Sequence, residues 1–219
     1  MFQPAAERCL SFWPATDCRD WKCLDIMRKI INRSPELSLP TLIKDRPLVF
    51  FDLEFSGLNF DNEIMSIGCV VVKPDDFGIV KEWSVKVKPK NLEIADRKAL
   101  EMIGYSEETW KDAVNLEEAL KEFNSVVKDA VLVGYNCSWD FLFLLKSYWE
   151  ENIEISFHWQ ILDVLPMAYL RLFNNKELKE FRMSEVKRFL GIEAEKSHDA
   201  LEDAKITYKI FMKLMKYGD

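Results

Sequence analysis

An apolar run interrupted by two acids constrains the fold of this chain more than any other feature. Residues 48–55 read Leu-Val-Phe-Phe-Asp-Leu-Glu-Phe, which is typical of a buried strand. Side chains two residues apart on a strand point to the same face, so Asp52 and Glu54 would project together. Their repulsion is expected to raise the pKa of at least one of the carboxyl groups. A divalent cation with oxygen ligands would compensate for this cost, and the alternative is an exposed edge strand with ordinary surface acids.

Apolar periodicity predicts an α/β domain with a mixed sheet. Further strands are expected at Ile64–Val72, 80–88 and Ala130–Gly134, with a weaker one at 154–157. Helices are expected at 116–127, Trp139–Trp149, 161–173, 183–190 and 199–216. Early strands followed by alternating strands and helices favour helices that flank one sheet.

Residues 1–46 differ in charge from the rest of the 219-residue chain. They carry eight Lys/Arg and six Asp/Glu, a net charge of +2, whereas the remainder carries 22 and 31, a net charge of −9. Apolar residues at helical spacing predict an amphipathic helix at 19–33, and the three prolines that follow it, Pro35, Pro40 and Pro47, indicate a linker. We therefore divide the chain into an N-terminal helical extension and linker, 1–46, and a main domain, 47–219. Packing of the helix against the main domain is favoured over docking of a partner.

The overall composition limits the cellular setting and the partners. No run approaches the roughly 18 apolar residues of a membrane span, and the first residues lack a secretory pattern, so no membrane partner is expected. Five cysteines without a Cys-x-x-Cys pair favour free thiols and a cytoplasmic location. The net charge of −7 excludes a strongly basic footprint for duplex nucleic acid, although bound cations could supply positive charge locally.

A second chemical motif spans residues 134–140, Gly-Tyr-Asn-Cys-Ser-Trp-Asp. It follows a predicted strand and opens a predicted helix, which is the junction where ligands usually bind in α/β proteins. Ser138 is expected to cap the helix, which places Asp140 in its first turn beside the positive end of the helix dipole. Taken alone, the motif is explained as well by simple helix capping.

A third motif lies before the last helix. Asp199 and Glu202 have capping-box spacing, with Asp in place of Ser or Thr, so the helix is expected to start near Ala200. Asp203 then falls about one turn into the helix. His198, one of only two histidines, lies outside the helix and is free to turn toward the same site.

Together these segments resemble the DEDDh exonuclease family, which includes the DnaQ-like proofreading subunit of the bacterial replicase. The family has Asp-x-Glu on its first strand, then Asn-x-x-x-Asp, then His followed five residues later by Asp. The matching residues are Asp52 and Glu54, Asn136 and Asp140, and His198 and Asp203. The sister group uses Tyr where this chain has Asp199, so the His variant is indicated. The resemblance covers about 47–215 and implies a ribonuclease H-like α/β fold.

The resemblance implies a 3′-to-5′ exonuclease that hydrolyses phosphodiester bonds at single-stranded or frayed DNA ends and releases nucleoside 5′-monophosphates. Two divalent ions, Mg²⁺ or Mn²⁺, would be held by Asp52, Glu54, Asp140 and Asp203, because hard cations prefer oxygen ligands. His198 would take the proton from the attacking water. The expected partner is the 3′ end of a single nucleic-acid strand, with a protein partner through residues 1–46 as a further option.

Two other features of the family bear on the substrate. Relatives often have Thr-Thr-Gly after the first Glu and contact the terminal nucleotide there, whereas this chain has Phe55, Ser56, Gly57 and Leu58. Those four residues and Asn136 are the candidates for substrate binding, and Asp163 resembles a recurrent family Asp with a supporting role. An RNA-trimming exonuclease of the same fold is the main alternative. A catalytically silent adaptor is disfavoured, because all four acids and the histidine are present.

Overall fold

The computed structural model describes residues 42–193 and 198–217. The helix predicted at 19–33 and most of the predicted linker therefore lie outside the described residues. The division of the chain at residue 46 stays a prediction.

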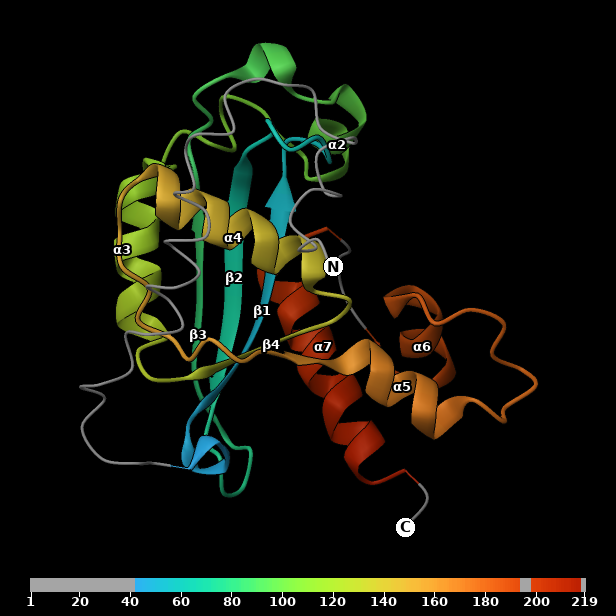
Figure 1. Cartoon of the computed structure of the whole chain (residues 1–219). Coiled ribbons are helices and arrows are strands. Elements are labelled where there is room, and N and C mark those ends of the chain that lie inside the picture. The colour runs from blue at the N-terminus through green and yellow to red at the C-terminus, as the bar shows by residue number, and fades with distance from the viewer. Residues whose placement is uncertain (1–41, 194–197, 218–219) are drawn as a thin grey trace, which may run out of the picture. The chain divides into compact units, whose positions relative to one another are not determined.

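A five-stranded mixed sheet forms the centre of the described part of the chain (Figure 1). In chain order the strands are β1 (Leu48–Phe55), β2 (Ile64–Val72), β3 (Ile79–Lys86), β4 (Val131–Gly134) and β5 (Leu162–Asp163). Their order across the sheet is β3-β2-β1-β4-β5, and β1 pairs antiparallel with β2 and parallel with β4. β1 is an inner strand of the sheet, although its pairing with β4 ends at Phe50. Asp52 and Glu54 are half-buried rather than exposed, so the alternative of an exposed edge strand with ordinary surface acids is wrong.

Helices cover both faces of the sheet, as predicted (Figure 1). One apolar core includes side chains of α3 (Leu116–Val126) and α4 (Ser138–Glu150). The other includes side chains of α5 (Val164–Leu172), α6 (Met183–Phe189) and α7 (Ala200–Met215). Along β1, Phe50 belongs to the α7 core and Phe51 to the α3/α4 core. Since strand side chains alternate, Asp52 and Glu54 continue the row of Phe50 on the α7 face.

Three short elements lie outside these layers. They are α2 (Arg97–Met102) and two 3₁₀ helices at Ile43–Asp45 and Leu92–Ile94. α2 was not predicted from the sequence, because a helix of six residues is too short for a helical period to be recognised. None of the helices in 42–193 and 198–217 is long and apolar enough to cross a membrane.

The strand predicted at 154–157 is wrong. That segment makes only isolated backbone contacts near the start of β4, including the N–H of Asp129 to the carbonyl of Ser156 at 2.8 Å. The fifth strand is instead Leu162–Asp163, inside the helix predicted at 161–173. The helix begins later because the Asp163 side chain accepts the N–H of Leu165 and caps α5.

Candidate active site

The start of α7 packs very closely against β2, next to the first segment of the site, which contains Asp52 and Glu54. Asp52 pairs with Gly68 across the β1–β2 ladder. A Cβ atom at Gly68 would lie 2.1 Å from the backbone nitrogen of Leu201, so only glycine lets the start of α7 rest on the sheet here. The role of Gly68 was not predicted from the sequence, although a lone glycine within a predicted strand is a recognised sign of close backbone approach.

The third segment, which contains His198, Asp199 and Asp203, lies at the start of α7. Asp199 caps the helix by accepting the N–H groups of Leu201 at 3.1 Å and Glu202 at 3.2 Å, so the predicted start at Ala200 is confirmed. His198 lies outside the helix with a φ of +64°, and its N–H donates to Asp203 Oδ2 at 3.1 Å.

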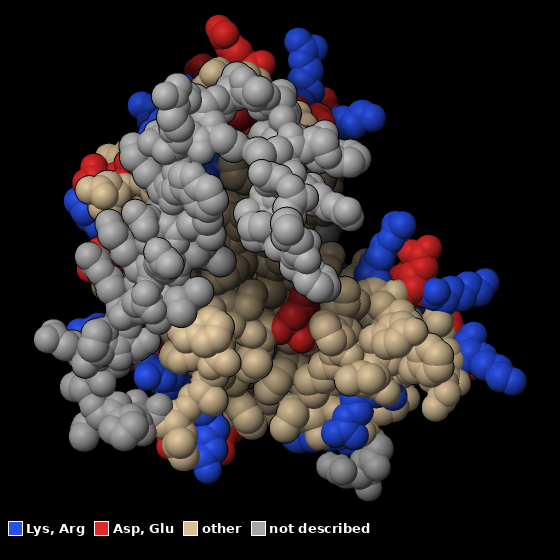
Figure 2. Space-filling model, viewed as in Figure 1, with Lys and Arg blue, Asp and Glu red and all other residues tan. Residues whose placement is uncertain are grey.

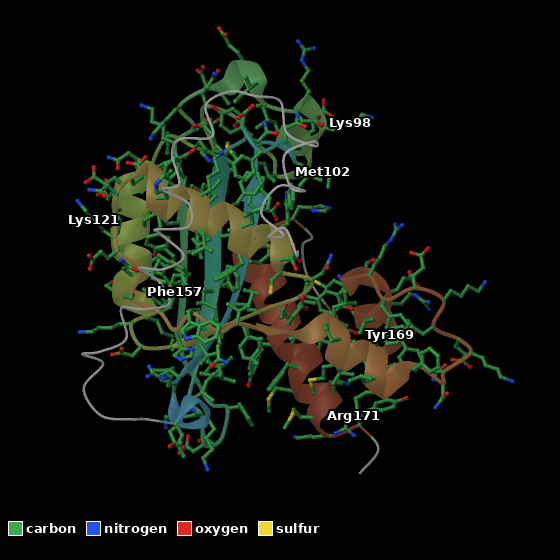
Figure 3. The ribbon with its side chains drawn as sticks, viewed as in Figure 1. Lys98, Met102, Lys121, Phe157, Tyr169 and Arg171 are labelled. Carbon is green, nitrogen blue, oxygen red and sulfur yellow. The ribbon has the colours of Figure 1, made fainter. Side chains whose placement is uncertain are left out.

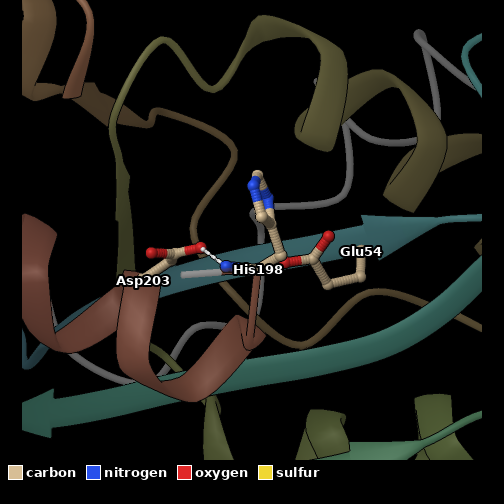
Figure 4. Close-up of side chains that lie close together, drawn as sticks. All are labelled: Glu54, His198 and Asp203. Carbon is tan, nitrogen blue, oxygen red and sulfur yellow. Dashed lines mark hydrogen bonds between the residues drawn. The ribbon is translucent and has the colours of Figure 1, made fainter. Parts of the chain in front are cut away.

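This fold brings three predicted residues together. Ligand atoms from Glu54, His198 and Asp203 all lie within 4.8 Å of one another (Figure 4). They come from β1, from the segment before α7 and from α7 itself. Two carboxylates and an imidazole at this spacing could share a metal ion.

The second segment contributes Asp140 from α4, whose side chains pack on the face of the sheet opposite to α7. Asp140 lies in the first turn of α4, as predicted, but the cap position is Cys137 rather than Ser138, and no side-chain cap bond forms. Asp140 Oδ1 accepts the N–H of Leu53 at 3.2 Å. This bond fastens the start of α4 to β1 between Asp52 and Glu54.

Asp163 supports the turn between β4 and α4. Its carboxylate accepts the N–H of Asn136 at 2.8 Å, of Cys137 at 3.2 Å and of Leu165 at 2.9 Å. Asn136 has a left-handed φ of +54°, a conformation that such bonds help to hold. Asp163 thus orients the turn that leads to Asp140.

All four acids are half-buried, and each has a raised pKa. For Asp52 the causes are burial first and then repulsion by Asp140, Glu54 and Asp203. Burial, with repulsion from Asp203 and Asp140, raises the pKa of Glu54 to about 8. Burial raises the pKa of Asp140 to about 6, although its hydrogen bond from Leu53 opposes the shift. The expected direction is therefore confirmed, but burial contributes more than repulsion.

This donor set fits a divalent cation. Carboxylate oxygens are the ligands that Mg²⁺ and Mn²⁺ prefer, and several of them are held here in a half-buried position where they repel one another. A bound cation would remove that repulsion. On the face seen in Figure 2, lysine and arginine side chains are spread around the margin of the described surface rather than gathered in one patch.

The predicted substrate-binding residues have different environments. Phe55 is half-buried, whereas Ser56 and Gly57 are buried, and Ser56 Oγ accepts the N–H of Glu63. The side chains of Leu58 and Asn136 are exposed.

Two exposed aromatic rings beside α4 were not predicted from the sequence. Trp139 precedes Asp140 in α4 and Phe60 lies in the loop after β1, and both rings pack near Phe143. Trp139 is adjacent to a motif residue, so its position in the sequence could have identified it. The position of Phe60 depends on how the loop folds.

Comparison with known proteins identifies the family of this chain. The model of an exonuclease family, RNase_T, matches residues 49–211. The chain belongs to this exonuclease family. The match contains every acid proposed as a ligand, and it confirms the DnaQ-like resemblance drawn from the three motifs.

Curated relatives include PolC-type DNA polymerase III from several bacteria. The chain is 29% identical over 183 residues to the PolC-type DNA polymerase III of Thermotoga maritima, covering 82% of the chain and 13% of the polymerase. It is 31% identical over 169 residues to the enzyme of that name from Caldanaerobacter subterraneus, covering 77% and 11%. The chain thus matches only a small part of the length of these relatives.

Solved structures confirm the fold. The zinc-bound E. coli exonuclease I complex with single-stranded DNA superposes with a TM-score of 0.67 at 18% identity, over 80% of this chain and 41% of that one. Cell-death related nuclease 4 superposes with a TM-score of 0.68 at 15% identity, over 79% and 64%. The mixed sheet and its flanking helices are therefore the ribonuclease H-like exonuclease fold.

Proposed function

We propose that this protein is a metal-dependent 3′-to-5′ exonuclease that removes nucleoside 5′-monophosphates from single-stranded or frayed DNA ends. The observation that carries the proposal is the meeting of Glu54, His198 and Asp203 within 4.8 Å on an exonuclease fold. Asp52 and Asp140 lie close enough to add to the repulsion in the same cluster.

Asp52, Glu54, Asp140 and Asp203 would hold two divalent ions, Mg²⁺ or Mn²⁺. When bound, such ions stabilise the attacking and leaving oxygens of an in-line phosphodiester displacement. The chain's own contribution is orientation. The bond from Leu53 fixes Asp140, and the bond from the His198 backbone fixes Asp203.

His198 would act as the general base. An imidazole accepts a proton near neutral pH, and this side chain is exposed, so a water molecule can reach it. The Asp203 carboxylate beside it would stabilise the imidazolium that forms. His198 is thus assigned to proton transfer, and the four acids to holding the ions.

DNA is proposed as the substrate because of the relatives. The similar curated proteins are DNA polymerases, and one matching structure is E. coli exonuclease I with a dT13 oligonucleotide. The proposed pathway is accordingly DNA repair or proofreading.

The test uses matched DNA and RNA single strands labelled at the 5′ end. With Mn²⁺ the DNA should shorten one nucleotide at a time from its 3′ end, and EDTA should stop the reaction. Preferential shortening of the RNA would replace DNA by RNA as the substrate. Binding without shortening of either strand would contradict the enzyme and favour an adaptor.

A further inference from the structure

The loop that joins β1 to β2, residues 56–63, is held by a buried amide. Asn62 is 1% exposed, and its Oδ1 accepts the N–H of Asn59 at 2.8 Å while its Nδ2 donates to the carbonyl of Ile94 at 2.9 Å. Gly57 has a φ of +152°, and a Cβ atom there would lie 2.5 Å from Asn62 Oδ1. The loop is therefore closely packed in one conformation rather than simply exposed.

A lysine from α4 completes this packing. Lys146 Nζ donates to the carbonyls of Phe60 at 2.5 Å and Asn62 at 3.1 Å, and it lies 5.2 and 5.3 Å from the ring centres of Phe60 and Phe143. Its side chain is only 12% exposed, and its ion pair with Glu150 is long, at 3.8 Å. Because a desolvated ammonium is costly unless its donors are satisfied, the loop carbonyls are its principal partners.

This contact joins two segments of the candidate site. The loop follows Glu54 closely in sequence, and the helix that carries Lys146 also carries Asp140. At the tip of the loop, Leu58 is 70% and Phe60 53% exposed. An exposed aromatic ring and an exposed apolar side chain on the loop that follows Glu54 suit unpaired bases, which stack on aromatic side chains without regard to sequence.

We propose that Lys146 is a positioning residue for substrate. It holds the 56–63 loop against α4 so that Leu58 and Phe60 meet the unpaired bases at the strand end. This inference rests on the proposed nuclease function. Since the Lys146 amine is occupied by the loop, its loss should weaken binding of the strand end more than it slows the chemical step.

The test compares Lys146→Met, which keeps the aliphatic stem, with Lys146→Arg, which keeps charge and donors. The matched control is Lys121→Met, because Lys121 projects from α3 away from the sheet and pairs with the exposed Glu117 (Figure 3). For 5′-labelled single-stranded DNA, Lys146→Met should raise KM about tenfold, equivalent to about 1.4 kcal/mol. Its kcat should stay within about threefold of the parent value, as expected for lost binding rather than lost chemistry.

Amide hydrogen exchange supplies a readout that does not depend on activity. Residues 56–63 should exchange faster in Lys146→Met, while Lys146→Arg and Lys121→Met should match the parent protein. Unchanged KM and unchanged exchange in Lys146→Met would overturn the inference, as would a fall in kcat at constant KM. If Lys146→Met does not fold, the same measurements of KM, kcat and exchange are made on Lys146→Gln. If the parent protein cleaves no substrate, the proposed function fails, but exchange still decides whether Lys146 holds the loop.

Discussion

The two halves of β1 differ in what they contribute. Residues 48–51 are at most 8% exposed and fill the apolar cores on both faces of the sheet. Asp52 and Glu54 continue the same strand, yet their carboxyls are half-buried and their pKa values are raised, so their charged forms destabilise the metal-free fold. One continuous strand thus supplies stability in its first half and places reactive groups in its second. Burial of the first half in the two apolar cores therefore offsets the free-energy cost of placing repelling carboxylates in the second half.

The largest expected effect comes from removing the charge of one of the four acids that cluster at the second half of β1. Changing Asp52, Glu54, Asp140 or Asp203 to the matching amide should abolish measurable turnover, because these carboxylates would hold the ions that stabilise the charge of the transition state. The far-ultraviolet circular dichroism should not change, because size and shape are preserved. Glu117→Gln, on the exposed side of α3, is the control and should turn over normally. A near-normal rate in any of the four variants would remove that residue from the site.

The next effect concerns proton transfer. His198→Ala should lower kcat by about 10²–10⁴-fold, the usual range for a general base. Metal affinity, measured by calorimetry with Mn²⁺, should change much less, since the acids are intact. Collapse of metal binding would instead make His198 a ligand and contradict the assigned role.

Much of this site could be predicted because its determinants are local. Strand alternation places Asp52 and Glu54 on one face, and the cap at Asp199 fixes where α7 begins, so both follow from short stretches of sequence. The two-residue strand β5 could not be predicted, because it exists only through its pairing with β4. Lys146 was missed for the same reason, since its partner Phe60 is 86 residues away.

Adjacent residues of β1 should respond in opposite directions in stability measurements. Phe51→Ala should lower the free energy of unfolding by about 3–5 kcal/mol, because it leaves a cavity in the α3/α4 core. Asp52→Asn should raise the stability of the metal-free protein at pH 8, since it removes a half-buried charge. Urea titrations in EDTA measure both. Loss of stability in Asp52→Asn would mean that the acid is not repelled in the folded state.

The free energy of unfolding measured in these titrations should also depend on pH, in a direction that the pKa shifts determine. Burial and repulsion raise the folded-state pKa of Glu54 to about 8, and burial raises that of Asp140 to about 6. Their unfolded values are about 4, so the folded protein holds these protons more tightly and is favoured at low pH. The stability of the metal-free protein should therefore fall as pH rises from about 4 to about 8, the window between these pKa values. A stability that rises across this window would contradict the assigned shifts.

The smallest expected effect lies outside the described residues. We propose that residues 1–40 assist substrate or partner binding but not chemistry, because every proposed catalytic residue follows them and they add positive charge. Their deletion should leave kcat on a short oligonucleotide intact and weaken affinity for longer strands, most visibly at low salt. An insoluble or much less stable truncated protein would contradict this. Unchanged affinity and unchanged stability would instead indicate that residues 1–40 serve to bind another protein.

The central claim is that the second half of β1 is built for metal. Thermal unfolding with and without saturating Mn²⁺, for the parent protein and Asp52→Asn, tests it most directly. A ligand that binds only the folded state stabilises it by about 2.7 kcal/mol at 100 times its dissociation constant. The account predicts a higher melting temperature for the parent protein in Mn²⁺ and no comparable rise for Asp52→Asn. An unchanged melting temperature for the parent protein at saturating Mn²⁺, or an equal rise in the variant, would contradict it.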